Sequence, residues 1–384
     1  MFFSRMVLKN WRNFAHVDVE LRDRMFIVGP NASGKSNFLD AFRFLHDLVK
    51  PAGGLQSAIA DRGGLSKIRC LAARKEPDVE IQVYLKNDLN SEIADWCYSI
   101  GIRQEVRGNR QPYLTHETVW KDNKKILDRP NESDKGDPLR KSQTHLEQIN
   151  ANTDFREIAR CFDSILYLHL VPQLLRHPKA FSGPDMPGDP FGRGFLNRVA
   201  KTTERTRRAR LRKIEEALKK AVPQLEQLKD VKDDAGVPHL EAIYKHWRLQ
   251  GAKQREDQFS DGTLRLIGLF WSLLEGDSML LLEEPELSLN SAIVSRLPAL
   301  IHRLQRAKKR QVLTTTHSVE LLSDKSIGAE STLLLKPSTE GTEAEVASSN
   351  KQIRSLLESG MSVADAVLPH TAPKNISQLV LFEN

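Results

Sequence analysis

The stretch Gly29-Pro30-Asn31-Ala32-Ser33-Gly34-Lys35-Ser36 decides the fold of this 384-residue chain. It matches the pattern G-x-x-x-x-G-K-[ST] at every position. An apolar, strand-like run, Met25–Val28, precedes it, and an amphipathic helical pattern over Asn37–Val49 follows. In this setting the glycines let backbone N–H groups turn toward a phosphate, and the helix N-terminus adds the positive end of its dipole. A chance glycine loop would not explain the flanking strand and helix.

Six residues of this loop and of the first helical turn are predicted to bind ATP. Lys35 is expected to reach the β- and γ-phosphate oxygens, and the Ser36 hydroxyl is expected to bind Mg²⁺. The six predicted residues are Gly29, Asn31, Gly34, Lys35, Ser36 and Asn37. The motif therefore indicates ATP and Mg²⁺ as cofactors.

A second motif, Met279–Glu286, places two adjacent carboxylates after an apolar run. Met279–Leu282 is typical of a buried strand, and Glu283 and Glu284 come at its end. We expect Glu283 to hold Mg²⁺ through water and Glu284 to act as the general base on the attacking water. An acidic loop after a core strand is the simpler alternative, and it loses weight because the same chain carries the phosphate loop.

The segment Gln258–Thr263, of sequence QFSDGT, opens an apolar helix over Leu264–Leu274. It resembles the signature of ABC-type ATPases found in SMC, RecF and OLD-type proteins, in which a serine and a glycine grasp the γ-phosphate bound by the opposite subunit. The physical chemistry agrees, because Ser260, the Gly262 N–H and the helix dipole form an anion site. An ordinary helix N-cap is the alternative, and the order of all the motifs favours the signature.

Two assignments near the C-terminal motifs rest on the same resemblance. His317 follows the strand-like run Gln311–Thr316 and resembles the switch histidine that contacts the γ-phosphate. A histidine at a strand end is more often structural, so its place in the motif series carries this assignment. Ser288-Leu289-Asn290 resembles the short loop that reaches across the dimer.

Two further assignments concern the edges of the site. Gln173, after the apolar run Ser164–Val171, is the candidate metal-sensing glutamine. Arg12 and Asn13 match a short N-terminal motif that touches the nucleotide in SMC-like relatives. A β-turn with a solvated arginine is the alternative for Arg12.

The resemblance runs from residue 1 to about residue 336 and implies an α/β fold of the ABC-type ATPase head. Such a head has a core sheet carrying the phosphate loop, an N-terminal antiparallel β-sheet and a helical insert. It also implies a homodimer with ATP sandwiched between subunits. Each site would join catalytic Glu284 and His317 of one chain with Ser260 and Gly262 of the other, and a higher oligomer is left open.

Two positions depart from the family pattern. Asp261 stands where many relatives carry glycine, and this difference resembles the RecF and OLD branch more than transporters. Glu283 stands where the class usually has aspartate. The longer glutamate arm is expected to make the metal site looser.

We expect three segments along the chain. Residues 1–150 would form an N-terminal ATPase lobe with the phosphate loop and an antiparallel meander over Val79–Leu85, Asp95–Val106 and Tyr113–Lys121, closed by a variable polar excursion over Lys121–Asn150. Residues 151–240 would form a helical lid with a basic helix within 195–228, where Pro223 marks a break or a new start. Residues 241–384 would form a C-terminal ATPase lobe with the signature, the two glutamates, a helix over Leu289–Leu304, His317 and a short tail.

Composition and charge narrow the class of protein. Hydrophobic residues make up 40% and charged residues 28%, as in an ordinary globular protein. No apolar run approaches the roughly 20 residues that cross a bilayer, and three distant cysteines suggest no disulfide framework. We therefore expect a cytoplasmic protein without a membrane partner.

The spacing of the motifs separates the possible kinds of ABC-type ATPase. The insert between Ser36 and Ser260 is too short for a chromosome-scale coiled coil, and its basic helix does not suit a transporter subunit. The chain after His317 contains no acidic cluster suited to two-metal chemistry, so no nuclease activity is expected in this chain.

The remaining resemblance is to stand-alone bacterial ATPases related to RecF and OLD proteins, on Phe259–Leu266, Leu282–Leu289 and the terminal stretch from Val367 to Phe382. It implies an ATP-hydrolysing, dimeric sensor or scaffold in anti-phage defence, with a separate effector protein, which could be a nuclease. The alternative is a RecF-like ATPase of DNA repair, which binds DNA. The arginine- and lysine-rich stretch 193–220 favours it, although a solvated surface explains such a charge run equally well. The net charge of +7 permits an acidic partner but is too modest to demand nucleic acid.

Overall fold

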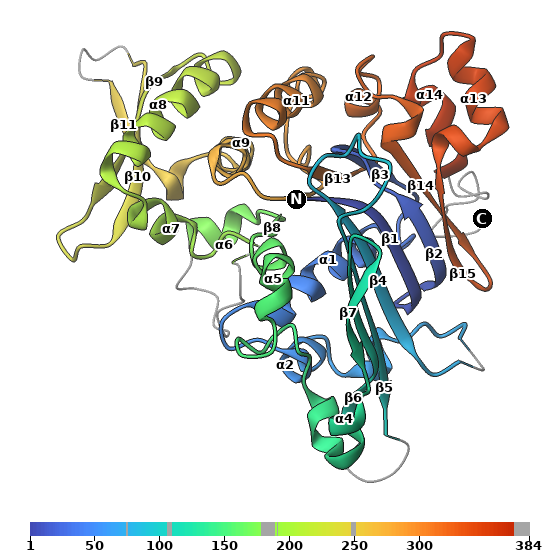
Figure 1. Ribbon diagram of the computed structural model, residues 1–384. Coiled ribbons are helices and arrows are strands. Elements are labelled where there is room, and N and C mark those ends of the chain that lie inside the picture. The colour runs from blue at the N-terminus through green and yellow to red at the C-terminus, as the bar shows by residue number, and fades with distance from the viewer. Residues whose placement is uncertain (74–75, 106–109, 178–188, 190, 247–250, 372–384) are drawn as a thin grey trace, which may run out of the picture. The chain divides into compact units, whose positions relative to one another are not determined.

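The computed structural model describes residues 1–73, 76–105, 110–177, 189, 191–246 and 251–371 (Figure 1). Contacts divide them into two compact units. Unit 1 joins Met1–Ile165 to the residues from Arg310 onward, and unit 2 is Leu166–Lys309. The predicted division into segments 1–150, 151–240 and 241–384 stays a prediction. The terminal motif 378–382 and most of the predicted loop 182–193 lie outside the described residues.

Unit 1 contains an antiparallel sheet in the order β2-β1-β4-β5-β6-β7. Its strands alternate, so that in β4 the side chains of Val79, Ile81, Val83 and Leu85 are buried and their neighbours are half-exposed. The predicted N-terminal antiparallel sheet is therefore confirmed. The strands are β1 (Phe2–Trp11), β2 (Phe14–Glu20), β4 (Val79–Lys86), β5 (Trp96–Gln104), β6 (Pro112–Lys121) and β7 (Lys124–Arg129).

Unit 1 also holds four strands in the order β15-β14-β3-β13. All five residues of β3 (Arg24–Val28) and of β13 (Val312–Thr316) are buried. These two strands are parallel, with Thr316 opposite Val28, and β14 (Thr332–Ser338) runs parallel to β3 on its other side. The hairpin partner of β14 is β15 (Gly341–Val346). The carboxyl ends of three parallel strands thus meet at one edge.

Helix α1 (Lys35–Val49) covers the core of unit 1 with an aromatic face. Phe42 packs edge-on against Phe3 of β1 at 5.2 Å, and Phe3 stacks on Phe162 of α5 at 5.8 Å. The other helices of unit 1 are α2 (Leu55–Ala60), α3 (Leu65–Ile68), α4 (Glu132–Gly136), α5 (Arg156–Asp163), α12 (Val319–Leu322), α13 (Lys351–Glu358), α14 (Val363–Val367) and the 3-10 turns η1 (Pro138–Ser142), η2 (Thr153–Phe155), η4 (Ala329–Ser331), η5 (Ala347–Ser349) and η6 (Leu368–Thr371).

The predicted variable excursion Lys121–Asn150 is more ordered than expected. Its start forms β7 on the edge of the sheet, and its remainder folds over a buried ionic cluster. Arg129 donates to Glu117 at 2.9 Å and to Asp134 at 2.8 Å, and none of the three side chains is more than 2% exposed. The polar composition that suggested a surface excursion instead satisfies a buried cation.

Unit 2 carries a parallel pair of strands, β8 (Leu166–Leu168) and β12 (Leu280–Glu283), and a separate antiparallel sheet in the order β11-β10-β9. That sheet consists of β9 (Leu225–Lys232), β10 (Pro238–Tyr244) and β11 (Ala252–Arg255). The helices of unit 2 are α6 (Pro172–Arg176), α7 (Phe195–Lys201), α8 (Glu204–Ala221), the 3-10 turn η3 (Glu256–Gln258), α9 (Asp261–Leu274), α10 (Ser291–Val294) and α11 (Leu297–Lys308).

The stretch 195–228, predicted to be helical with Pro223 as a break or a new start, is helical only as far as Ala221. Two helices, α7 and α8, occupy the first part, and the chain then turns into β9 at Leu225. Pro223 explains the end of α8, because a proline disfavours the helical conformation of the residue before it. That residue, Val222, has a non-helical backbone with φ −131° and ψ 79°. At 18 residues, α8 spans about 27 Å at 1.5 Å per residue. The predicted helix Leu289–Leu304 is likewise divided, into α10 and α11.

No helix among the described residues is long and apolar enough to span a lipid bilayer.

Candidate nucleotide-binding and catalytic site

The phosphate loop follows β3 directly and ends where α1 begins. Gly34 precedes α1 with φ 95° and ψ 20°, a left-handed conformation that glycine adopts without strain. No described side chain caps α1, so its first N–H groups are open to an anion. Lys35 is buried and donates to the Gly29 carbonyl at 3.0 Å and to that of Pro30 at 3.2 Å. The lysine is therefore curled over the loop.

The loop has the features of a cradle for an oxyanion. A Cβ on Gly29 would lie 2.5 Å from Ser33 Oγ and 2.9 Å from the Leu335 carbonyl, so only glycine fits there. Ser33 Oγ is buried and finds no hydrogen-bond partner among the described residues. Buried hydroxyls rarely stay without a partner, and a phosphate oxygen would satisfy this one. The residues present therefore fit a nucleotide phosphate.

Asn13 braces the loop from the β1–β2 hairpin. Its Nδ2 donates to the Ser33 carbonyl at 2.8 Å and to Thr342 Oγ1 at 2.7 Å, and its Oδ1 accepts from Asn37 Nδ2 at 2.8 Å. Because Trp11 lies opposite Phe14, Arg12 and Asn13 are the two residues of the hairpin turn. The structure thus brings the predicted residues Asn13 and Asn37 together at the phosphate loop.

Arg12 is held by a carboxylate that the motif analysis did not assign. Its Nε and one terminal nitrogen donate to Asp40 of α1, the latter at 2.9 Å, and the other terminal nitrogen donates to the Lys67 carbonyl at 3.2 Å. Arg62 also binds Asp40, at 2.8 Å. Burial of Asp40 disfavours its charged form, but Arg62 and then Arg12 outweigh this and lower the pKa of the carboxyl.

A cleft of about 720 Å³ opens beside the loop in unit 1. It is lined by residues of the β1–β2 turn, of the phosphate loop and the start of α1, of α3 and the segment after it, and of the β14–β15 hairpin. Arg12, Asn13, Ala32, Asn37 and Thr342 are among its lining residues. The cleft is continuous with the phosphate loop through Ala32 and Asn37, so a nucleoside attached to a phosphate in the loop has room there.

His317 lies at the same sheet edge as the phosphate loop. Thr316 pairs with Val28 in parallel register, so the next residues, His317 and Gly29, both leave the sheet at its carboxyl edge. His317 is exposed. The register of two strands far apart in sequence therefore supports the predicted proximity of this histidine to the loop.

The predicted metal ligand Glu283 and the predicted general base Glu284 belong to unit 2. Glu283 ends β12 and accepts a hydrogen bond from the Tyr167 hydroxyl of the neighbouring strand β8. Glu284 has a φ of 43°, a left-handed conformation that costs a non-glycine residue about 1–3 kcal/mol and occurs preferentially at functional sites. The two successive carboxylates thus lie at the end of a buried strand, the second of them on a left-handed backbone.

The predicted signature residues open α9 in unit 2. Ser260 is the N-cap, and its Oγ accepts from the Thr263 N–H at 3.2 Å. A Cβ on Gly262 would lie 2.8 Å from the Ser288 carbonyl, so this glycine permits close approach of the loop after β12. Ser288 itself has a φ of 60°. The signature and the loop predicted to cross the dimer are thus in contact within one chain.

Gln173 lies in α6, where it donates from Nε2 to Asp261 at 3.1 Å. The structure therefore places this predicted metal-sensing residue beside the signature, and its role at the metal stays a prediction. The remaining predicted residues divide between the units: the phosphate loop, Arg12, Asn13, Asn37 and His317 are in unit 1, and Gln173, Ser260, Gly262, Glu283 and Glu284 are in unit 2.

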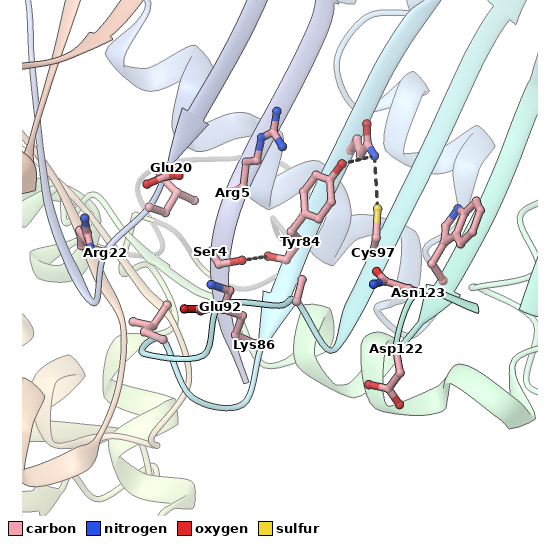
Figure 2. Close-up of a pocket in the computed structure, with 15 residues that line it drawn as sticks. Ser4, Arg5, Glu20, Arg22, Tyr84, Lys86, Glu92, Cys97, Asp122 and Asn123 are labelled. Carbon is pink, nitrogen blue, oxygen red and sulfur yellow. Dashed lines mark hydrogen bonds between the residues drawn. The ribbon is translucent and has the colours of Figure 1, made fainter. Parts of the chain in front are cut away.

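A second cleft of unit 1, of about 570 Å³, lies on the antiparallel sheet and shares no lining residue with the first (Figure 2). Register places Arg5, Tyr84, Cys97 and Trp120 in one row across four strands. Arg5 stacks on the Tyr84 ring at 5.2 Å, and Glu20, Glu92 and Asp122 bring carboxylates to the rim. This mixed charge does not select one class of ligand.

Sequence reasoning missed three residues of the site. Asp40 carried a misleading signal, because helical spacing puts it with Asp47, opposite the apolar stripe of Phe38 and Phe42, yet it is only 8% exposed in the structure. Thr342 and Arg176 carried none, since they reach Asn13 and Asp261 from parts of the chain 329 and 85 residues away.

Comparison with protein families matches residues 24–323 to a model described as "AAA domain, putative AbiEii toxin, Type IV TA system". A curated relative, endonuclease GajA of Bacillus cereus (strain VD045), is 49% identical over 47 residues. That stretch is 12% of this chain and 8% of GajA, so the similarity covers a small part of that protein.

Solved structures of SMC heads share the fold. The SMC head bound to the C-terminal winged-helix domain of ScpA has a TM-score of 0.57 at 16% identity, over 90% of this chain and 98% of that one. The Smc head of Pyrococcus furiosus with an extended coiled coil, bound to the C-terminal domain of ScpA, has a TM-score of 0.53 at 15% identity, over 94% and 99% of the two chains. These likenesses confirm the predicted α/β head with its N-terminal antiparallel sheet.

Proposed function

This chain belongs to the family of AAA domains described as putative AbiEii toxins of type IV toxin–antitoxin systems, and from that premise we propose that it hydrolyses ATP at sites shared by two copies of itself. The observation that carries the proposal is the phosphate loop, with its left-handed Gly34, its unpartnered buried Ser33 hydroxyl and its uncapped helix. Membership of the P-loop ATPase class is shown by the family, and hydrolysis and dimerisation are the proposed steps.

The proposed roles in one site rest on the chemistry of the motifs and, for Gln173 and His317, on the resemblance to ABC-type ATPases. Lys35 binds the β- and γ-phosphates, Ser36 and Glu283 hold Mg²⁺, and Gln173 senses the metal. The metal neutralises charge that develops on the phosphates. Glu284 takes a proton from the attacking water, and His317 contacts the γ-phosphate. Among these, the left-handed φ of Glu284 supports a functional role most directly.

The second copy contributes its Ser260 and Gly262. An N-cap hydroxyl and the N–H groups of a 14-residue helix form an anion site. Opposite them, the first copy presents a phosphate. The two halves complete each other in a two-fold symmetric dimer, in which the same surface is used by both copies. A higher oligomer built from such dimers is compatible with this arrangement.

Complementation between two inactive variants tests the shared site. Lys35→Ala should bind no ATP, and Ser260→Arg should bind ATP but not turn it over. When the two variants are mixed and allowed to exchange subunits, they should recover about a quarter of wild-type turnover. Half of the dimers then contain one copy of each variant, and each such dimer has one intact site of its two. Turnover by Ser260→Arg alone, or a mixture that stays inactive, would refute the shared site.

A third variant tests the base. Glu284→Gln keeps the shape of the side chain and removes its basicity, so it should bind ATP and accumulate as a dimer on size-exclusion chromatography with turnover lowered about 100-fold or more. Glu284→Gln that hydrolyses ATP like the wild type would show that another group activates the water.

We further propose that the ATPase serves anti-phage defence in the cytoplasm, together with a separate effector, and has no nuclease centre of its own. The short similarity to GajA and the toxin family support the defence role only. Phage plating on cells that carry the gene with its neighbours should fall relative to cells with Lys35→Ala, and the purified chain should leave plasmid DNA intact in Mg²⁺ or Mn²⁺. Equal plating, or plasmid cleavage that is lost in Lys35→Ala, would overturn the respective claim.

A second candidate function, DNA binding in repair, is favoured by one feature of unit 2. Helix α8 buries Leu211, Ile214 and Leu218, and its opposite side exposes basic residues. The residues that share one stripe at helical spacing are Arg205, Arg208, Arg212 and Lys219. Such a stripe suits the phosphates of duplex DNA.

Salt dependence separates this function from a solvated surface. Replacing Arg205 and Arg212 with glutamine should lower the slope of log affinity against log salt by about 1.8, that is about 0.9 for each lost phosphate contact. The same change at Lys124 and Lys125, two exposed residues of β7, is the matched control. Equal slopes for both pairs, or ATP turnover indifferent to DNA, would leave the stripe as a solvated surface.

A further inference from the structure

Arg176 of α6 contacts the loop that opens α9 on both sides of Ser260. One terminal nitrogen of its guanidinium donates to the Phe259 carbonyl at 2.7 Å and to Asp261 Oδ1 at 2.6 Å. The side chain of Arg176 is only 19% exposed. The residues before and after Ser260 are therefore tied to a single guanidinium.

The carboxylate of Asp261 is held through both of its oxygens. Arg176 binds Oδ1, and Gln173, three residues earlier in α6, donates to Oδ2 at 3.1 Å. Arg265, one turn further along α9, also acts electrostatically on Asp261. The carboxylate is thus directed toward α6 and surrounded by donors.

This arrangement answers a difficulty raised by the sequence. Asp261 stands where many relatives of the resembled class carry glycine, and a free carboxylate beside Ser260 would repel an incoming phosphate. A guanidinium within hydrogen-bonding distance offsets that charge, and because the same terminal nitrogen also binds the Phe259 carbonyl, it ties together the residues on both sides of Ser260. The local charge then stays favourable to an anion at the helix N-terminus.

We propose that Arg176 is a positioning residue for the signature: it neutralises Asp261 and orients the Phe259–Asp261 backbone so that Ser260 and the first N–H groups of α9 face the phosphate bound by the other copy. This inference rests on the proposed shared ATP site. In this proposal Arg176 acts through Ser260 and does not itself touch the nucleotide.

The charge part of the proposal is tested with Arg176→Gln, Asp261→Asn and the double variant of the full-length chain. Arg176→Gln should lower kcat about 10- to 100-fold, as misplaced groups commonly do, and leave the Kd for ATP within about threefold. Asp261→Asn removes the repulsive charge, so the double variant should return to within about fivefold of Asp261→Asn alone. Arg103 of β5 and Asp78, just before β4, also form an arginine–aspartate pair, there through two hydrogen bonds. Arg103→Gln is therefore the control for loss of such a pair elsewhere and should keep wild-type kcat.

The positioning role predicts a readout that loss of stability would not produce. Arg176→Gln should regain activity when mixed with Lys35→Ala, because the mixed dimer contains one intact phosphate loop facing one intact signature. Its Tm should match that of the Arg103→Gln control within a few degrees.

The possible results are distinct. Wild-type kcat in Arg176→Gln, no rescue by Asp261→Asn, or no complementation by Lys35→Ala would each overturn the role of Arg176. A wild-type chain that neither binds nor hydrolyses ATP would instead overturn the proposed function on which the inference rests.

Discussion

Replacing Gly34 with alanine tests the brace around the phosphate loop. Gly34 has a φ of +95°, and a Cβ there would overlap the side-chain amide of Asn13, whose Cγ would lie 2.6 Å away. The left-handed backbone costs an L-residue about 1–2 kcal/mol. The displaced amide also gives up its bonds to Ser33, Thr342 and Asn37.

The structure sets the size of the effect. Three hydrogen bonds at about 1 kcal/mol each, added to about 1 kcal/mol of backbone strain, give a loss of unfolding free energy near 4 kcal/mol. Gly360 provides the control, because it also has a positive φ, +92°, and a Cβ there meets nothing within 4 Å. Gly360→Ala should therefore cost only about 1 kcal/mol.

A double-mutant cycle isolates the overlap from the strain. Asn13→Ala should cost about 3 kcal/mol, the worth of its three bonds. Once the amide is gone, Gly34→Ala adds only its strain, so the double variant should lose about 4 kcal/mol and not the additive 7 kcal/mol or so. Chemical denaturation followed by circular dichroism measures the free energies, and equilibrium titration measures ATP affinity.

The outcome for nucleotide binding is equally specific. Gly34→Ala should weaken ATP binding about 100-fold or more, because the displaced loop no longer directs its N–H groups at one point, and Gly360→Ala should leave the affinity unchanged. Equal losses of stability in the two glycine variants, or an additive cycle, would refute the idea that Asn13 and Gly34 form one packed brace.

Two further predictions concern buried charge. Arg129→Met should lower the unfolding free energy by about 3–5 kcal/mol, because it leaves the fully buried Glu117 carboxylate without its cation; adding Glu117→Gln should recover part of the loss of Tm, and a Tm within a degree or so of wild type would contradict this. Burial disfavours the charged form of His239, but the hydrogen bond to Glu256 at 2.6 Å, the negative charge of Glu256 and the hydrogen bond to Asp233 together outweigh this and raise the pKa of His239 above 6.5. The stabilisation by His239 is therefore complete below about pH 6.5 and is lost as pH rises through the raised pKa. The Tm difference between wild type and His239→Gln should be larger at about pH 5.5 than at about pH 9. A Tm difference that does not change with pH would refute this role of His239.

Local patterns were enough to predict much of the site. The strand, glycine loop and helix around Gly29–Ser36, and the buried strand before Glu283, are produced by short-range preferences, and they appear where they were expected. The antiparallel meander also followed from alternation alone. The predicted element boundaries were less accurate around Pro223. There the helix ends at Ala221, and a strand that pairs with β10 begins at Leu225.

The contacts that align the site could not be predicted in this way. Asn13 reaches Thr342 across 329 positions, and Arg176 reaches Asp261 across 85. No local preference specifies such a pair, since it forms only after strands and helices have packed. Arg129 illustrates the same limit, because a polar stretch looks like surface until its charges find each other inside.

The amino-acid sequence by itself determined that this chain builds a phosphate loop with carboxylates and a signature helix in a fixed order, because those motifs depend on neighbouring residues and on backbone chemistry. Only the tertiary structure decided which side chains hold them in place: Asn13 and Thr342 at the loop, Asp40 at Arg12, and Arg176 at Asp261. The physical reason is that hydrogen bonds and ion pairs of buried groups require partners at a defined distance and angle, and folding, not sequence spacing, supplies those.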